Sequence, residues 1–130
     1  MNKKKTLSVL GTGSFAFDTI VKREYPDGFI PGKRNGFVEK VVMEEIGSNP
    51  GNVMCILGYL GWHSCPIALF DDSAQGVQMT KDFLRYGCDT RFVNNSPDGG
   101  TNCLKVIHCL DEEGRPTRKF SKRHAPGSGF

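Results

Sequence analysis

Two polar residues set among small and apolar neighbours have the side-chain chemistry to bind a ligand. Asp18 is the only charged residue between Gly11 and Val21, and Asn52 follows the small and turn-forming residues 47–51. A carboxylate accepts hydrogen bonds from two hydroxyl groups, and a carboxamide both donates and accepts, so the pair suits a polyol such as a sugar. Turn capping by Asp18 and helix capping by Asn52 are the structural alternatives, and the residue types leave both open.

The glycines that precede Asp18 raise a different possibility. Gly11-x-Gly13-x-x-Ala16 matches the letters of the dinucleotide-binding fingerprint. That fingerprint requires a helix that begins at the glycines, because the helix N-terminus holds the pyrophosphate. Residues 17–21 are typical of a strand, so we favour a plain glycine turn over a dinucleotide site.

Two further groups of residues could carry chemistry. His108 lies near Cys103, but their spacing fits no zinc pattern, and strand alternation separates the thiols from the imidazole. The basic residues within 115–123 could bind phosphate or nucleic acid, although such runs more often protect the solvated edge of a hairpin. We therefore expect structural roles for both groups.

The elements that position these residues follow from hydrophobic periodicity. Apolar or alternating runs predict strands at residues 6–10, 37–46, 65–70, 91–93, 102–110 and 117–120. Apolar spacing of i, i+3, i+4 and i+7 predicts a helix opened by Asn52 and stopped by Gly61. Residues 71–73 can cap a second helix that runs to Tyr86. This order predicts a layered α/β body with a small antiparallel flap.

Composition sets the limits of these expectations. A chain of 130 residues with 38% hydrophobic residues forms one domain, and a net charge of +3 implies neither a nucleic-acid nor a membrane partner. Five cysteines without a C-x-x-C pair indicate reduced thiols in the cytoplasm, and no signal peptide or membrane span is expected. Two helices cannot cover both faces of a parallel sheet, so we expect the front part of a longer protein.

Four stretches in chain order carry a family resemblance. They are Gly13-Ser14-Phe15-Ala16-Phe17-Asp18, Pro31-Gly32, Gly47-Ser48-Asn49-Pro50-Gly51-Asn52-Val53 and Asp71-Asp72-x-x-x-Gly76. Together they resemble the N-terminal part of the ribokinase-like (PfkB) carbohydrate kinases over nearly the whole chain. Three residues depart from the family pattern: Ala16 replaces the usual Asn of ribokinases, Ser48 replaces a second Gly, and Phe70 replaces a Gly.

The resemblance implies transfer of the ATP γ-phosphate to a hydroxyl of a sugar or nucleoside. Asp18 and Asn52 would bind hydroxyls, and the other substrate-binding residues would be Ala16, Gly47, Ser48 and Asn49. A lid formed by residues of about 33–46 and 101–120 would close over the sugar. The full-length enzyme would use ATP and Mg²⁺. The Gly-Ala-Gly-Asp segment that supplies the catalytic Asp is missing, as is the C-terminal nucleotide-binding half, so we expect this segment to bind neither cofactor and to be inactive alone.

Other functions remain open at this stage. The chain could be a non-catalytic binding module, or a homodimer formed through the lid strands. A dinucleotide-binding fragment is less favoured, and nucleic-acid binding through residues 115–123 would show strong salt dependence. We expect a small sugar or nucleoside as partner, with no nucleic acid and no membrane.

Overall fold

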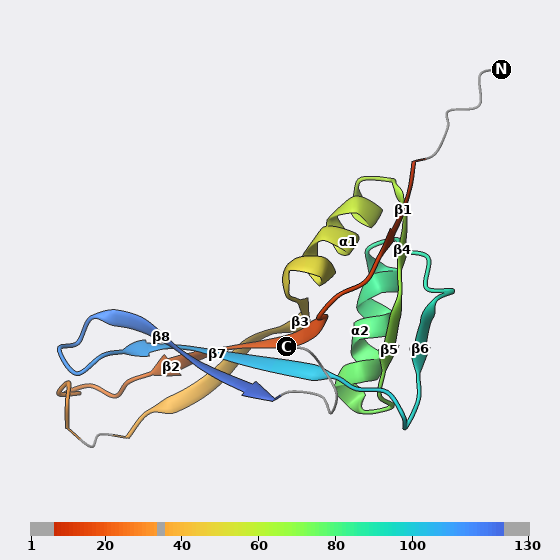
Figure 1. Ribbon diagram of the computed structural model, residues 1–130. Coiled ribbons are helices and arrows are strands. Elements are labelled where there is room, and N and C mark those ends of the chain that lie inside the picture. The colour runs from red at the N-terminus through yellow and green to blue at the C-terminus, as the bar shows by residue number, and fades with distance from the viewer. Residues whose placement is uncertain (1–6, 34–35, 124–130) are drawn as a thin grey trace.

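The computed structural model describes residues 7–33 and 36–123, and Figure 1 shows an α/β body from which a long four-stranded sheet extends. Thr6 of the first predicted strand and residues 34–35 of the predicted lid lie outside the described ranges. In chain order the elements are β1 (Ser8–Gly11), β2 (Ala16–Glu24), β3 (Val38–Gly47), α1 (Asn49–Tyr59), β4 (His63–Pro66), β5 (Ala68–Phe70), α2 (Ala74–Arg85), β6 (Val93–Asn95), β7 (Asn102–Leu110) and β8 (Pro116–Arg123).

The sheet of the body is parallel. β4 pairs with β1, and β5, which follows it after one residue, pairs with β6. The change of partner occurs at Ile67, whose N–H donates to the carbonyl of Gly11 at 2.8 Å, while the N–H of Ala68 donates to Phe92 at 3.1 Å. The single strand predicted at 65–70 is therefore divided between two neighbours, and the strand predicted at 91–93 lies at 93–95.

Helix α1 begins at Asn49, three residues before the predicted start at Asn52. Pro50 lies in the first turn, where a proline is favourable because the missing N–H has no helical acceptor. Asn52 thus lies inside the helix, and its interpretation as the helix N-cap is wrong. The predicted cap of α2 is confirmed, since the Ser73 hydroxyl accepts a hydrogen bond from the N–H of Gly76 at 3.1 Å.

The four-stranded sheet has the order β3-β2-β7-β8. Its outer pairs are antiparallel, and the central pair, β2 with β7, is parallel. The predicted antiparallel flap contained only the segments around β3, β7 and β8. Because β2 directly follows Gly13, no helix begins at the glycines, and the plain glycine turn is confirmed in place of a dinucleotide fingerprint.

Aromatic side chains fill the core where the four-stranded sheet joins the α/β body. Phe15 packs edge-on against Phe83 and Phe70, with ring centroids 5.4 and 6.0 Å apart. Phe83 and Met79 of α2 are completely buried. The start of β2 is therefore fixed to α2 by hydrophobic packing.

A buried carboxylate fixes the end of β3 to the same helix. Asp82 is 1% exposed, and its Oδ2 accepts a hydrogen bond from the N–H of Ile46 at 2.8 Å. Its Oδ1 accepts from Gln78 Nε2 at 2.9 Å and lies 3.6 Å from the Arg85 guanidinium. This contact sets the position of Gly47, the next residue.

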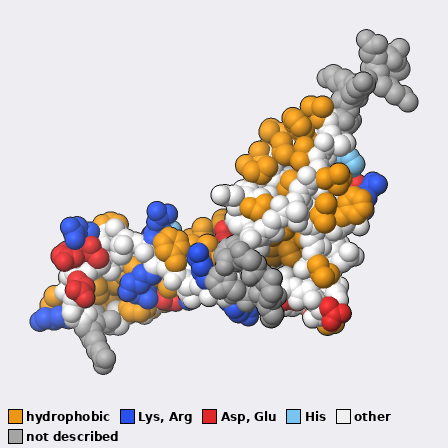
Figure 2. Space-filling model, viewed as in Figure 1, with side chains coloured by type: hydrophobic (Ala, Val, Ile, Leu, Met, Phe, Trp, Pro, Cys, Tyr) orange, Lys and Arg blue, Asp and Glu red, His pale blue; other side chains and the backbone are white. Residues whose placement is uncertain are grey.

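Much apolar surface is exposed on the body. Figure 2 shows hydrophobic side chains gathered along its upper edge. Exposed apolar residues in or next to β1, α1 and β5 include Leu7, Leu10, Val53, Ile56, Leu60 and Leu69. Contiguous surface of this kind marks a face that another segment or partner covers. No helix in the described part of the chain has the length and hydrophobicity to cross a lipid bilayer.

We expect Asp82→Ala to lower the free energy of unfolding by about 3 kcal/mol, because it leaves the buried N–H of Ile46 without an acceptor. Urea unfolding followed by circular dichroism measures the change. The matched control is Asp98→Ala at an exposed carboxylate, for which a change within about 0.5 kcal/mol is expected. Equal effects of the two substitutions would contradict the anchoring role of Asp82.

Candidate functional site

The candidate site lies where β2, β3 and the N-terminus of α1 meet. Asp18 is the third residue of β2, and its side chain lies directly against Gly47, the last residue of β3. A Cβ atom at Gly47 would be 1.8 Å from Asp18 Oδ2. Glycine is therefore required at position 47 for the carboxylate to occupy this place.

Ser48 connects β3 to α1 in a strained conformation. Its φ of 67° and ψ of 166° fall in a region that essentially only glycine occupies, at a cost of about 1–3 kcal/mol for other residues. The Ser48 hydroxyl donates to the carbonyl of Ser14 at 2.5 Å, and its backbone N–H donates to the Asp18 carboxylate. Glycine would adopt this conformation without strain, so the serine at position 48 concentrates strain beside Asp18.

The Asp18 carboxylate is only partly satisfied. Its Oδ1 is buried and has no hydrogen-bond partner among the described residues. Burial raises the pKa of Asp18 above its usual value; the N–H of Ser48 opposes this shift, and the charge of Glu45 adds to it. An acceptor oxygen without a donor is what a ligand hydroxyl would satisfy.

A half-buried apolar surface continues from Asp18 along the four-stranded sheet. Asp18 pairs in register with Leu104, and Ile20 pairs with Val106. Because alternate residues of a strand share a face, these side chains lie on the same face as the carboxylate. No ligand role was predicted for these side chains, although the alternation of apolar residues within 102–110 is a sequence signal that indicates a shared face.

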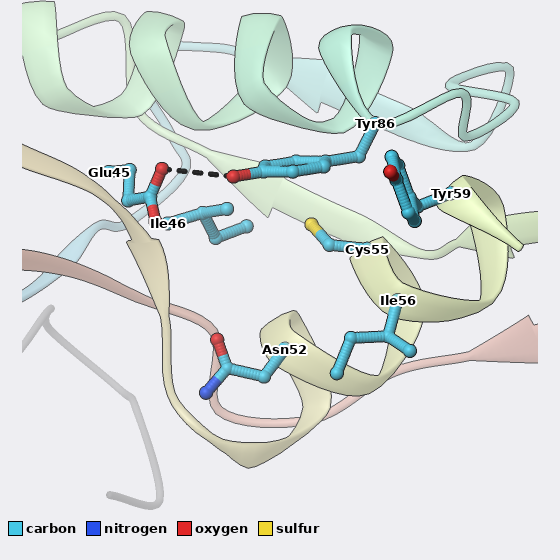
Figure 3. A pocket seen from close by; sticks show the side chains of 7 residues that line it. All are labelled: Glu45, Ile46, Asn52, Cys55, Ile56, Tyr59 and Tyr86. Carbon is cyan, nitrogen blue, oxygen red and sulfur yellow. Dashed lines mark hydrogen bonds between the residues drawn. The ribbon is translucent and has the colours of Figure 1, made fainter.

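Asn52 borders a second feature, a cavity of about 340 Å³ between α1 and α2. Figure 3 shows Glu45 and Asn52 on one side of this cavity and Tyr59 on the other, with the Tyr86 hydroxyl donating to Glu45 at 3.1 Å. Asp18 does not line the cavity.

Ser48 links the two predicted hydroxyl-binding residues. Its carbonyl accepts the backbone N–H of Asn52 at 2.9 Å, and its own N–H donates to the Asp18 carboxylate. The contact of Asn52 with Ser48 is made by its backbone alone, whereas its side chain lines the cavity between α1 and α2, which Asp18 does not line.

The remaining predicted residues differ in accessibility. Gly47 and Ser48 contact Asp18 directly. Asn49 is exposed at the first position of α1. Ala16 is 1% exposed and lies between its register partners Gly47 and Asn102. Its side chain thus supports the backbone around Asp18 from within the core.

The basic residues of β8 do not act as one group. Arg118 and Arg123 are five positions apart on the strand, so they point to opposite faces of the sheet. Arg118 pairs with His108 on the face of Asp18, whereas an Nη of Arg123 contacts Cys103 Sγ at 3.2 Å. Arg118 and Arg123 therefore cannot contact the same phosphate group from one face of the sheet.

Sequence comparison identifies no relatives: no family model matches the chain, and no curated protein matches it significantly. Solved structures do match. The chain superposes on a fructokinase from Xylella fastidiosa with a TM-score of 0.64 and 20% identity, covering 93% of this chain and 33% of the other. For a putative ribokinase from Agrobacterium tumefaciens the TM-score is 0.67, with 17% identity and coverage of 92% and 37%.

An Arabidopsis thaliana ribokinase complexed with ribose and ATP also matches, with a TM-score of 0.63, 14% identity and coverage of 89% and 36%. The expected resemblance to the ribokinase-like kinases and the α/β fold class are confirmed at the level of the fold. The chain spans about a third of the length of these structures.

The strain at Ser48 predicts a difference between two substitutions. Ser48→Gly and Ser48→Ala both lose the hydrogen bond to Ser14, but only glycine relaxes the backbone. We therefore expect Ser48→Gly to be more stable than Ser48→Ala by about 1–3 kcal/mol in urea unfolding. Equal stabilities would show that residue 48 is not strained.

From the raised pKa of Asp18 we predict that the effect of Asp18→Asn on stability depends on pH. A raised pKa means that the folded state binds the proton more tightly than the unfolded state, so the contribution of Asp18 to stability falls as pH rises from about 4 through the folded pKa. We expect Asp18→Asn to melt at a higher temperature than the unsubstituted chain at pH 7. The difference should shrink toward pH 4, and a difference that grows on acidification contradicts the prediction.

Proposed function

We propose that this chain is the sugar-binding portion of an ATP-dependent carbohydrate kinase. The observation that carries the proposal is the buried, unpartnered Oδ1 of Asp18 beside the Gly47–Ser48 turn. Structural neighbours that are fructokinases and ribokinases support it.

The chemistry around Asp18 suits a polyol. The Oδ1 atom accepts one sugar hydroxyl, and the remaining lone pairs of the carboxylate accept a neighbouring one. Hydrogen bonds to a charged acceptor in a partly buried place are stronger than those between neutral groups. Ile20, Leu104 and Val106 offer apolar contact to the carbon side of the ring, and Asn52 provides a donor and an acceptor across the turn.

The four-stranded sheet serves as the lid in this proposal. It extends away from the body (Figure 1). By strand register, the face that carries Asp18 also carries Ile20, Leu104 and Val106. Closure of such a sheet over a bound sugar excludes water from the hydroxyl that receives the phosphoryl group. The chain thus positions the acceptor, and phosphoryl transfer depends largely on such positioning.

In this proposal the described residues serve the sugar and not the nucleotide. Mg²⁺ prefers carboxylate, carbonyl and water oxygens. Among residues 7–33 and 36–123, the only grouping of three metal-binding side chains contains a thiol and an imidazole, which do not suit Mg²⁺. ATP, Mg²⁺ and the catalytic base would come from a further part of the kinase, which would also cover the apolar surface of the body.

A second candidate is a binding module that dimerises through its sheet. β3 is an edge strand with exposed Val38, Val41 and Val42, and exposed Phe120 lies on the other edge strand, β8. Uncovered apolar edges of this kind favour pairing between chains. Light scattering separates this candidate from a monomeric sugar-binding chain.

We expect the chain to bind a sugar weakly, and Asp18→Asn to reduce the affinity at least about tenfold, since it removes a charged acceptor. Saturation-transfer NMR with a panel of neutral sugars and an acidic sugar measures the binding. Asp98→Asn is the matched control and should bind like the unsubstituted chain. Sugar binding that is unchanged by Asp18→Asn would rule out the proposed site.

We expect the purified chain to show no ATP-dependent phosphorylation of any sugar of that panel, measured by release of ADP. The reason is that no segment of the sequence resembles the one that supplies the catalytic Asp in the family. Measurable sugar-dependent turnover by the chain alone would contradict the assignment of this chain to the acceptor side only.

A further inference from the structure

Three side chains with metal-binding atoms meet at the other end of the parallel sheet. His63 and Cys65 are two residues apart on β4, so they share one face of the strand, and Asp89 lies in the loop that connects α2 to β6. Their donor atoms all lie within 4.8 Å of one another. Cys65 Sγ is 3.3 Å from His63 Nε2, which is 2.8 Å from Asp89 Oδ2.

The backbone holds these three residues in place. Asp89 is fixed beside β4 because its N–H donates to the carbonyl of Ser64 at 2.8 Å. The hydroxyl of Ser64 points to the opposite side, where it donates to the carbonyl of Met54 in α1 at 2.8 Å. The cluster therefore lies on the face of the sheet that α1 does not cover.

We propose that His63, Cys65 and Asp89 form a binding site for a divalent transition-metal ion of the zinc type. A thiolate, an imidazole nitrogen and a carboxylate oxygen are the three ligand types that Zn²⁺ accepts in proteins. Tetrahedral zinc separates its ligand atoms by roughly 3.3–3.8 Å. The observed separation of 3.3 Å between Cys65 Sγ and His63 Nε2 lies within this range, and that of 2.8 Å between His63 Nε2 and Asp89 Oδ2 needs to open by about half an ångström.

The surroundings of His63 fit this role. Ser8 Oγ is 3.0 Å from His63 Nδ1 and can accept the Nδ1 proton in the tautomer that a metal ion needs, with the lone pair on Nε2. Without the metal ion, Nε2–H donates to the Asp89 carboxylate at 2.8 Å, and binding moves this proton to Nδ1. Such a hydrogen bond to the second nitrogen is the usual way in which proteins orient a metal-binding histidine. On binding, the Cys65 thiol releases its proton to solvent, and the thiolate and carboxylate together balance the charge of the ion.

The cluster is partly open to solvent on one side. Cys65 is buried, whereas the side chains of His63 and Asp89 are 39% and 22% exposed. Water can therefore occupy a fourth coordination position. Arg91 contacts Asp89 Oδ2 through Nε at 2.8 Å and through Nη2 at 2.7 Å, which orients the carboxylate.

The site is distinct from the proposed sugar site. Ser8 and His63 are the first residues of β1 and β4, and Asp89 precedes β6, so the cluster lies at the amino ends of the parallel strands. Asp18 lies beyond the carboxyl end of β1. A metal ion in this position would join β4 to the α2–β6 loop and stabilise the body without contacting the sugar.

The test is titration of the metal-free 130-residue chain with Zn²⁺ in competition with a chromophoric chelator, and with Co²⁺ followed by absorption. We expect one Zn²⁺ per chain and a thiolate-to-cobalt charge-transfer band. Cys65→Ser should remove the band and weaken Zn²⁺ binding about 100-fold, and Asp89→Asn and Ser8→Ala should weaken it about tenfold. Circular dichroism checks that each variant folds. If Cys65→Ser does not fold, Asp89→Asn still tests the proposal, because Asp89 lies in a partly exposed loop.

Matched controls are Cys103→Ser, His108→Gln and Asp98→Asn, which change the same residue types outside the cluster and should leave both titrations unchanged. No Zn²⁺ binding by the unsubstituted chain overturns the proposal. It is also overturned if Cys65→Ser keeps the cobalt band, if Asp89→Asn binds Zn²⁺ as tightly as the unsubstituted chain, or if Cys103→Ser loses the band.

Discussion

The contact of the Asp18 carboxylate with the Gly47–Ser48 turn is the constraint on which the candidate site depends. The carboxylate occupies the space that a side chain at position 47 would fill, and it accepts the N–H of Ser48. Phe15 and Asp82 hold the two sides of this contact, because one packs the start of β2 against α2 and the other fixes the end of β3 to the same helix. The body thus positions the site through hydrophobic packing and one buried carboxylate.

Strain and desolvation coincide at this turn. Ser48 adopts a backbone conformation that suits glycine, and Asp18 is half-buried, with its Oδ1 atom buried and unpartnered among the described residues. Both features lower the stability of the chain, and both place polar groups where a ligand can use them. Their coincidence at one turn is the physical basis for the proposal that a sugar binds there. The backbone around the proposed metal site, at the amino ends of the strands, has no comparable strain among the described residues.

Much of the fold was predictable from local pattern. A cap for α2 within residues 71–73, the strand at 102–110 and the glycine turn before Asp18 were all correctly predicted, because each depends on the chemistry of a few neighbouring residues. Three details of the fold could not be predicted in this way. The early start of α1, the division of one strand between two partners at Ile67 and the inclusion of β2 in the four-stranded sheet depend on which distant segments pair, and hydrophobic periodicity contains no such information.

For the candidate site, too, some features were predictable from the sequence and others were not. The sequence by itself determined the residue types: a lone carboxylate in an apolar stretch and a glycine-containing turn before a helix, in the order that resembles the ribokinase-like kinases. Only the tertiary structure decided that Asp18 lies against Gly47, that Leu104 shares its face, and that Arg118 and Arg123 point to opposite sides. It alone brought together His63, Cys65 and Asp89, because Asp89 is far from β4 in the sequence and reaches it only through the pairing of its backbone with Ser64.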